Sequence, residues 1–129
     1  DELNELMVDV DPVQIREVLV NILYNAYQSF KDYAGTIAVK GSTTEDQRTI
    51  YMDITDNGCG ISPETMENIF IPFFTTKSKG TGLGLSICKE LIHLHNGELE
   101  ISSKHGEGTT VRVYLPVSQE KWNEKNTDH

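Results

Sequence analysis

The chain lacks most of the features that would assign it to a specialised structural class. No apolar run is long enough to span a membrane, and no segment resembles a signal peptide. There is no internal repeat. The two cysteines, Cys59 and Cys88, do not have the spacing of a metal site and are too few for a disulfide scaffold. We therefore expect free thiols in a reducing compartment.

Positive charge is also scarce. The 11 Lys and Arg residues face 20 Asp and Glu residues, which gives a net charge of −9. Nucleic acid and anionic membrane surfaces would repel such a chain, so neither is expected as a partner. The 129 residues are enough for one domain with its own core. Because the first residue is Asp1 and not Met, we expect a piece of a longer protein.

Hydrophobic periodicity predicts three helices and five β-rich segments. The clearest helix spans residues 11–30, with Asp11 as its N-cap and Pro12 in its first turn. The pattern then predicts an α/β two-layer sandwich, in which about three helices cover one face of a mixed sheet. The other expected elements are helices over 62–70 and 82–97, strands over 5–11, 36–42, 49–55, 98–104 and 109–117, and a polar tail over 118–129.

The first helix carries a polar stripe beside its apolar face. Glu17, Asn21 and Asn25 are spaced four apart, so they share one side of the helix. Asparagine is a poor residue for a helix interior, because its side chain competes for backbone hydrogen bonds. One interpretation is that the amide oxygens reach a hydrated Mg²⁺. An ordinary solvated face explains the stripe as well, and the helix alone favours that explanation.

A second candidate is the segment DNGCGI, which follows an alternating β-rich run. Asp56 would lie at the carboxyl end of a strand, where a buried carboxylate needs hydrogen-bond donors. The amino group of adenine is one such donor. Gly58 and Gly60 would let the chain turn away sharply and leave a pocket. A plain Asp-Asn-Gly turn on the surface is the competing interpretation.

Three alternate glycines, Gly80, Gly82 and Gly84, precede the second long helix. A bare backbone at a helix start suits phosphate, because glycine permits close approach and the helix offers unpaired N–H groups. The spacing fits neither a dinucleotide-binding fingerprint nor a P-loop. Lys77 and Lys79 could meet phosphate oxygens as flexible point charges.

Four segments in one order resemble the catalytic, ATP-binding domain of bacterial two-component sensor histidine kinases. This family belongs to a superfamily (GHKL, with the Bergerat fold) that includes type II topoisomerases, heat-shock chaperones and mismatch-repair ATPases. The resemblance runs from about Leu6 to Pro116, which predicts a catalytic domain over 1–117. The matching segments are EVLVNILYNAYQSF for the N box, DITDNGCGI for the first glycine box, IFIPFFTTK for the F box and GTGLGLSI for the second glycine box.

The resemblance implies a role for individual residues. Asn25 would bind Mg²⁺, Asp56 would accept the adenine amino group, and a lid over 75–81 would close on ATP. The implied catalytic residues are Asn21, Glu17 and Lys77. The implied nucleotide-binding residues are Asn21, Asn25, Asp56, Gly58, Gly60, Ile61, Phe70, Thr76, Lys77, Gly80, Thr81, Gly82, Leu83, Gly84, Leu85, Thr109 and Thr110.

Two positions depart from the family pattern. Gln28 and Ser29 stand where many members carry Lys and Tyr, so a helix-borne cation for the phosphates is missing. More of that role would then fall on Lys77 and Lys79.

The phosphoacceptor is also expected elsewhere. No histidine lies in a family-type H-E-[IL]-x-x-P context, so the acceptor would belong to a separate dimerisation helix. The chain alone would be a monomer with little turnover. The family implies a cytoplasmic domain, whose parent kinase can be membrane-anchored, and an indirect response-regulator partner. The histidines read as structural or incidental are His93, His95, His105 and His129.

Two other activities share this fold. ATP-hydrolysing switches of the topoisomerase or chaperone kind place a glutamate base one turn before the Mg²⁺ asparagine, where this chain has Asn21. Because an asparagine cannot act as that base, Asn21 favours a kinase over an ATP-hydrolysing switch. An anti-sigma serine kinase would act on a small antagonist protein, and only the F box and the short lid speak against it.

Overall fold

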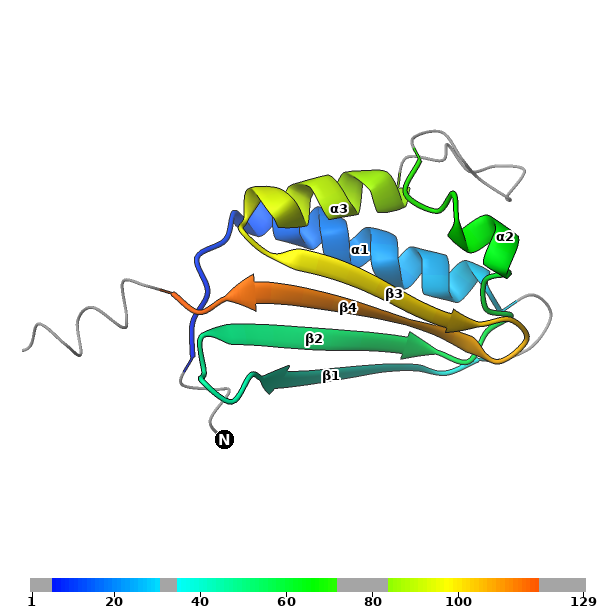
Figure 1. Ribbon diagram of the computed structural model, residues 1–129, viewed down its shortest axis with the longest axis horizontal. Helices are drawn as coiled ribbons and strands as arrows, with labels where there is room; N and C mark the ends of the chain where they lie inside the picture. The colour runs from blue at the N-terminus through cyan, green and yellow to red at the C-terminus, as the bar shows by residue number, and fades with distance from the viewer. Residues whose placement is uncertain (1–5, 31–34, 72–83, 119–129) are drawn as a thin grey trace, which may run out of the picture.

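The computed structural model describes residues 6–30, 35–71 and 84–118, and its elements form two layers. Figure 1 shows α1 and α3 side by side over one face of a sheet, with α2 near the end at which α3 begins. The expected α/β two-layer sandwich is confirmed. The helices are α1 (Pro12–Gln28), α2 (Pro63–Met66) and α3 (Gly84–Leu94), and the strands are β1 (Ile37–Thr43), β2 (Thr49–Asp56), β3 (Glu98–Lys104) and β4 (Gly108–Pro116).

The four described strands lie in the order β1-β2-β4-β3, and every pairing is antiparallel. The expectation of a mixed sheet was therefore wrong for this part of the chain. The physical reason is the connections: β1 and β2 form one hairpin, β3 and β4 form another, and hairpins can only join antiparallel strands. The strand expected over 5–11 is reduced to one antiparallel bridge between Val8 and Val117.

Local sequence explains the start of α1. The Oδ1 atom of Asp11 accepts hydrogen bonds from the backbone N–H groups of Val13 at 2.9 Å and Gln14 at 3.2 Å. Pro12 has no N–H to satisfy and stands in the first helical position. The predicted cap is confirmed, and the helix that it begins carries the polar stripe.

The core lies between the helix pair and the covered face of the sheet. Cys88 is fully buried in α3, and its thiol lies 3.6 Å from the carbonyl oxygen of Val18 in α1. Burial raises the pKa of the Cys88 thiol to about 12, and both cysteines are free. The helices are thus held together by buried apolar contact. The core residues are Val18, Ile22, Ile54, Cys88, Ile92, Leu99, Val111 and Val113.

No helix in the described ranges is both long enough and apolar enough to cross a membrane.

Candidate functional site

The packing of α3 on α1 brings the start of α3 against the polar stripe. Gly84, the first residue of α3, lies so close that an added β-carbon would be 3.8 Å from Asn25 Nδ2 and 3.9 Å from Asn21 Oδ1. Both asparagines are partly buried, whereas Glu17 one turn earlier is exposed. The stripe is therefore not an ordinary solvated face, because two of its three members line a junction between helices.

This junction has the chemistry of an anion and cation site. The first N–H groups of a helix have no partner within the helix, and the helix dipole makes that end partly positive. The carboxamide oxygens of Asn21 and Asn25 are hard donors of the kind that Mg²⁺ accepts. The residues present therefore fit a phosphate group with its magnesium ion. The described residues contain no cluster of three or more His, Cys, Asp or Glu side chains that would suit a different metal.

Asp56 supplies a second polar centre at the carboxyl end of β2. It is one of two buried polar residues in the described part of the chain, with 8% of its surface exposed. Its Oδ1 atom accepts a hydrogen bond from the backbone N–H of Gly58 at 2.9 Å and lies 3.4 Å from Ser29 Oγ. Within the described residues both bonds reach Oδ1. The other oxygen, Oδ2, is the one that could accept from a ligand.

The glycine loop after Asp56 is packed too tightly for side chains. A β-carbon on Gly58 would collide with Ser29 Oγ, and one on Gly60 would collide with the carbonyl of Lys104. Gly60 also has a φ of +72°, a left-handed conformation that glycine adopts without strain. The loop is held further by a bond of 2.6 Å from Gly106 N–H to the Cys59 carbonyl. The sharp turn expected from the sequence is present.

Strand register separates the two predicted threonines. Thr109 pairs directly with Asp56, so both face the helix side of the sheet. Thr110 pairs with Thr55, and their hydroxyl oxygens are 3.0 Å apart on the uncovered face. The structure therefore brings Thr109 to the Asp56 end and puts Thr110 on the opposite face. Nearby, the Ile61 N–H donates to Ser103 Oγ at 2.7 Å, and Ser103 Oγ lies 2.8 Å from Thr109 Oγ1.

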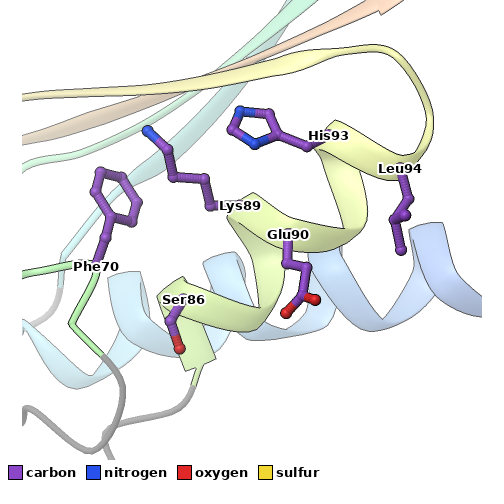
Figure 2. Close-up of a pocket in the computed structure, with 6 residues that line it drawn as sticks. All are labelled: Phe70, Ser86, Lys89, Glu90, His93 and Leu94. Carbon is purple, nitrogen blue, oxygen red and sulfur yellow. The ribbon is translucent and has the colours of Figure 1, made fainter.

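Phe70 lies apart from these residues, beyond α3. The ammonium group of Lys89 is 4.2 Å from the centroid of its ring, and Figure 2 shows both beside His93. Residues 86, 89 and 93 are on the side of α3 opposite to Gly84, so this surface faces away from α1. It forms a hollow of about 370 Å³, lined by Phe70, Ser86, Lys89, Glu90, His93 and Leu94.

A larger hollow of about 760 Å³ lies along β3. It also includes Phe70 and Lys89, and it reaches Thr110 and Arg112 on β4. Neither hollow contains the asparagines or Asp56. The junction at Gly84 and the hollows at Phe70 are thus separate surfaces.

Part of the predicted site lies outside the described residues. Leu85 follows Gly84 in α3 and is partly buried. The predicted residues that fall outside the described ranges are Thr76, Lys77, Gly80, Thr81, Gly82 and Leu83, together with Lys79.

His93 and His95 make structural contacts far from the junction. His93 Nε2 lies 3.0 Å from Glu98 Oε1, and this contact holds the pKa of the Glu98 carboxyl below its usual range. His95 Nε2 accepts from the Asp11 N–H at 3.0 Å. His93 is at the end of α3 away from Gly84, about 14 Å along the axis at 1.5 Å per residue, and His95 follows the last residue of the helix. His105 is exposed in the turn between β3 and β4.

Ser29 is a site residue whose contacts sequence reasoning missed. The sequence marked it only as a departure from the family pattern, yet it touches both Asp56 and the Gly58 loop. Asp56 and Ser29 are 27 residues apart. A contact between a helix end and a loop so far along the chain leaves no periodic signal, so no pattern in the sequence could have found it.

Known proteins match this arrangement closely. Residues 10–119 match the family model described as histidine kinase-, DNA gyrase B- and HSP90-like ATPase. The sensor histidine kinase ZraS of Escherichia coli is 36% identical over 111 residues, which are 86% of this chain and 23% of that protein. The chain thus spans about a quarter of this curated relative.

Solved structures agree. The mycobacterial sensor histidine kinase MprB superposes with a TM-score of 0.76 at 27% identity, covering 87% of this chain and 78% of that one. The nucleotide-free catalytic domain of histidine kinase ThkA gives 0.73 at 33% identity, covering 88% and 73%. The chain belongs to the family of histidine kinase-, DNA gyrase B- and HSP90-like ATPases, in which it is a catalytic domain of the sensor histidine kinase type.

Proposed function

We propose that this domain binds Mg²⁺–ATP between Asp56 and the Gly84 junction and donates the γ-phosphoryl group to a histidine on a separate dimerisation domain. The observation that carries the proposal is the position of Gly84, where a β-carbon would lie 3.8 Å from the Asn25 carboxamide and 3.9 Å from that of Asn21. It places a helix N-terminus beside two carboxamide side chains, which can supply the oxygen ligands that a magnesium-bound phosphate chain needs.

The adenine end of the site is assigned to Asp56. Within the described residues the buried Asp56 carboxylate accepts at Oδ1, so Oδ2 is the strong acceptor that we assign to the amino group of adenine. Gly58 and Gly60 let the loop after Asp56 pack against Ser29 and Lys104, which fixes the turn beside the carboxylate. Thr109 and Ile61 stand close enough to complete the pocket, whereas Thr110 faces away and is omitted.

The phosphate end is assigned to α1 and α3. Asn25 is the proposed magnesium ligand, and Asn21 and the N–H groups at the start of α3 would hold phosphate oxygens. When bound, the ion bridges phosphate oxygens and reduces their negative charge. Lys77 remains the proposed cation of the lid. Glu17 would stand at the outer end of the stripe, near the γ-phosphate.

Transfer to an imidazole fits these residues better than hydrolysis. Phosphoryl transfer depends mainly on positioning and charge stabilisation, and the attacking imidazole is itself the nucleophile. Hydrolysis needs a base that activates water, and the position suited to it holds Asn21, whose amide is not basic. Glu17 is exposed and lies one turn before Asn21, further from Asn25.

The acceptor histidine is assigned to a partner domain, because the histidines in the described ranges are distant from the junction or exposed. This assignment makes the histidine-bearing dimerisation domain of the same kinase the direct partner and a response regulator an indirect one. Because sensor kinases of this type dimerise through that partner domain, we propose that this domain alone is a monomer. We also propose that it is cytoplasmic.

The test is transfer in trans. The chain is incubated with Mg²⁺ and ATP that carries radioactive γ-phosphate, together with a fragment of the parent kinase that contains the dimerisation helices. We expect label on the fragment that is stable in alkali and lost in acid, as a phosphohistidine is. The Asp56→Asn variant is the control and should transfer much less. Release of free phosphate without labelled fragment would contradict the proposal and favour an ATPase switch.

A further inference from the structure

Ser29, the C-cap residue of α1, contacts Asp56 and the loop that follows it. Its hydroxyl oxygen is 3.4 Å from Asp56 Oδ1, and its carbonyl accepts from the Cys59 N–H at 3.2 Å. A β-carbon on Gly58 would overlap this hydroxyl. Asp56, Gly58 and Cys59 thus depend on where α1 ends.

The hydroxyl has one proton and two acceptors within reach. It lies 2.6 Å from the carbonyl of Ala26 and 3.4 Å from Asp56 Oδ1. The Ala26 carbonyl also receives the backbone N–H of Ser29 at 3.1 Å. That carbonyl therefore stays satisfied when the hydroxyl turns, whereas the Asp56 carboxylate gains a second donor.

A second hydrogen-bond donor to Oδ1 would fix the orientation of the Asp56 carboxylate. A carboxylate that is held by one bond can rotate about its χ2 angle, which is a broad torsion. When the Ser29 hydroxyl turns to Asp56, donors from Gly58 and Ser29, which come from different elements, restrict that rotation. The rotation decides where Oδ2 points, and Oδ2 is the oxygen left for a ligand.

We propose that Ser29 is a positioning residue that orients the Asp56 carboxylate toward the adenine amino group. The inference rests on the proposed adenine contact of Asp56 and adds a residue that determines base specificity. Ser29 touches no ligand in this account and acts only through Asp56 and the Gly58 loop. Substitution of Ser29 should therefore weaken the binding only of ligands that carry the amino group.

The test compares two nucleotides on two proteins by calorimetric titration with Mg²⁺. ATP carries the amino group, and purine riboside triphosphate has hydrogen in its place. Ser29→Ala should bind ATP about three- to tenfold more weakly than the unchanged chain, the range of an ordinary hydrogen bond, because the Asp56 carboxylate is then less firmly oriented. Its affinity for purine riboside triphosphate should stay the same. Ser102→Ala, which removes an exposed hydroxyl on β3, is the matched control and should change neither.

The outcomes separate this inference from the proposed function. An equal loss for both nucleotides, or no loss for either, overturns the positioning role of Ser29. A thermal melt shows whether an equal loss follows from a loosened fold. If the unchanged chain itself binds both nucleotides equally well, the adenine contact of Asp56 fails, and with it the premise of the inference.

Discussion

Gly84 at the start of α3 lies against the Asn25 carboxamide of α1, at a distance where a β-carbon would make an ordinary contact of 3.8 Å. A methyl group at this position therefore fits the protein. It would stand in the space between the helix start and the asparagines, where we place the phosphates.

This geometry predicts that Gly84→Ala separates folding from binding. The variant should be as stable as the unchanged chain or slightly more stable, because alanine is a better helix residue than glycine. ATP affinity should fall about tenfold or more, which corresponds to about 1.4 kcal/mol or more. Ser86→Ala, in the same turn but on the opposite side of α3, is the control. Unchanged ATP affinity in Gly84→Ala, measured by calorimetry, would remove the phosphates from this junction.

Asn25→Ala tests the magnesium ligand. In the unchanged chain, we expect chelation of Mg²⁺ to weaken ATP binding. The variant should bind ATP weakly with or without the ion, because the oxygen donor is lost. Gln14→Ala, on the first turns of the same helix, should keep the full magnesium effect. A variant at Asn25 that still responds to chelation would rule out the ligand role.

Asp56→Asn tests the adenine contact. The amide keeps one oxygen that can accept from the Gly58 N–H, so the fold should persist. ATP affinity should fall by about tenfold to a hundredfold, the range expected for a hydrogen bond to a charged group. Asp53→Asn, on the uncovered face of the sheet, should leave ATP affinity unchanged. Calorimetric titration measures the ATP affinity of both variants, and thermal melts measure their stability. Equal ATP affinity in Asp56→Asn and the unchanged chain would contradict the adenine contact of Asp56.

An ion pair on the uncovered face predicts a pH dependence of stability. Arg112 donates to Asp53 through Nε at 2.6 Å and through a second nitrogen at 2.8 Å, and its guanidinium stacks 4.2 Å from the centroid of the Tyr51 ring. The hydrogen bond from Arg112 holds the pKa of the Asp53 carboxyl below its usual range. A carboxyl with a lowered pKa in the folded state stabilises the fold above its unfolded pKa, and this stability is lost as the pH falls.

The free energy of unfolding should therefore differ between the unchanged chain and Asp53→Asn by about 1 kcal/mol or less at pH 7, as for other solvent-accessible ion pairs. The difference should shrink as the pH falls below about 4, where the carboxyl of the unfolded chain takes up its proton while that of the folded chain is still charged. Urea unfolding at several pH values measures it. A difference that stays constant down to pH 3 would show that the pair does not cause it.

The starts of the helices could be predicted from the sequence, because a helix cap depends on a few neighbouring residues. Asp11 and Pro12 mark the start of α1, and Ser62 and Pro63 mark the start of α2, with Ser62 Oγ accepting from the Thr65 N–H at 3.2 Å. The expectation that some strands pair in parallel was wrong for the described strands. Whether two strands are parallel depends on which strands become neighbours, and that is decided by tertiary structure.

The site was predictable to the extent that its residues lie in motifs. Asp56, Asn21 and Asn25 belong to such motifs, but the face on which Thr109 and Thr110 point depends on a register that their own sequence leaves open. The contact of Ser29 with Asp56 is a tertiary one and has no sequence signal.

The most direct test of the central claim is calorimetric titration of this chain with ATP and with GTP, each with and without Mg²⁺. GTP presents a carbonyl where ATP presents an amino group, so the Asp56 carboxylate should reject it. We predict binding of ATP that is strengthened by Mg²⁺ and no measurable binding of GTP. Equal binding of both nucleotides, or of neither, would contradict the site described here.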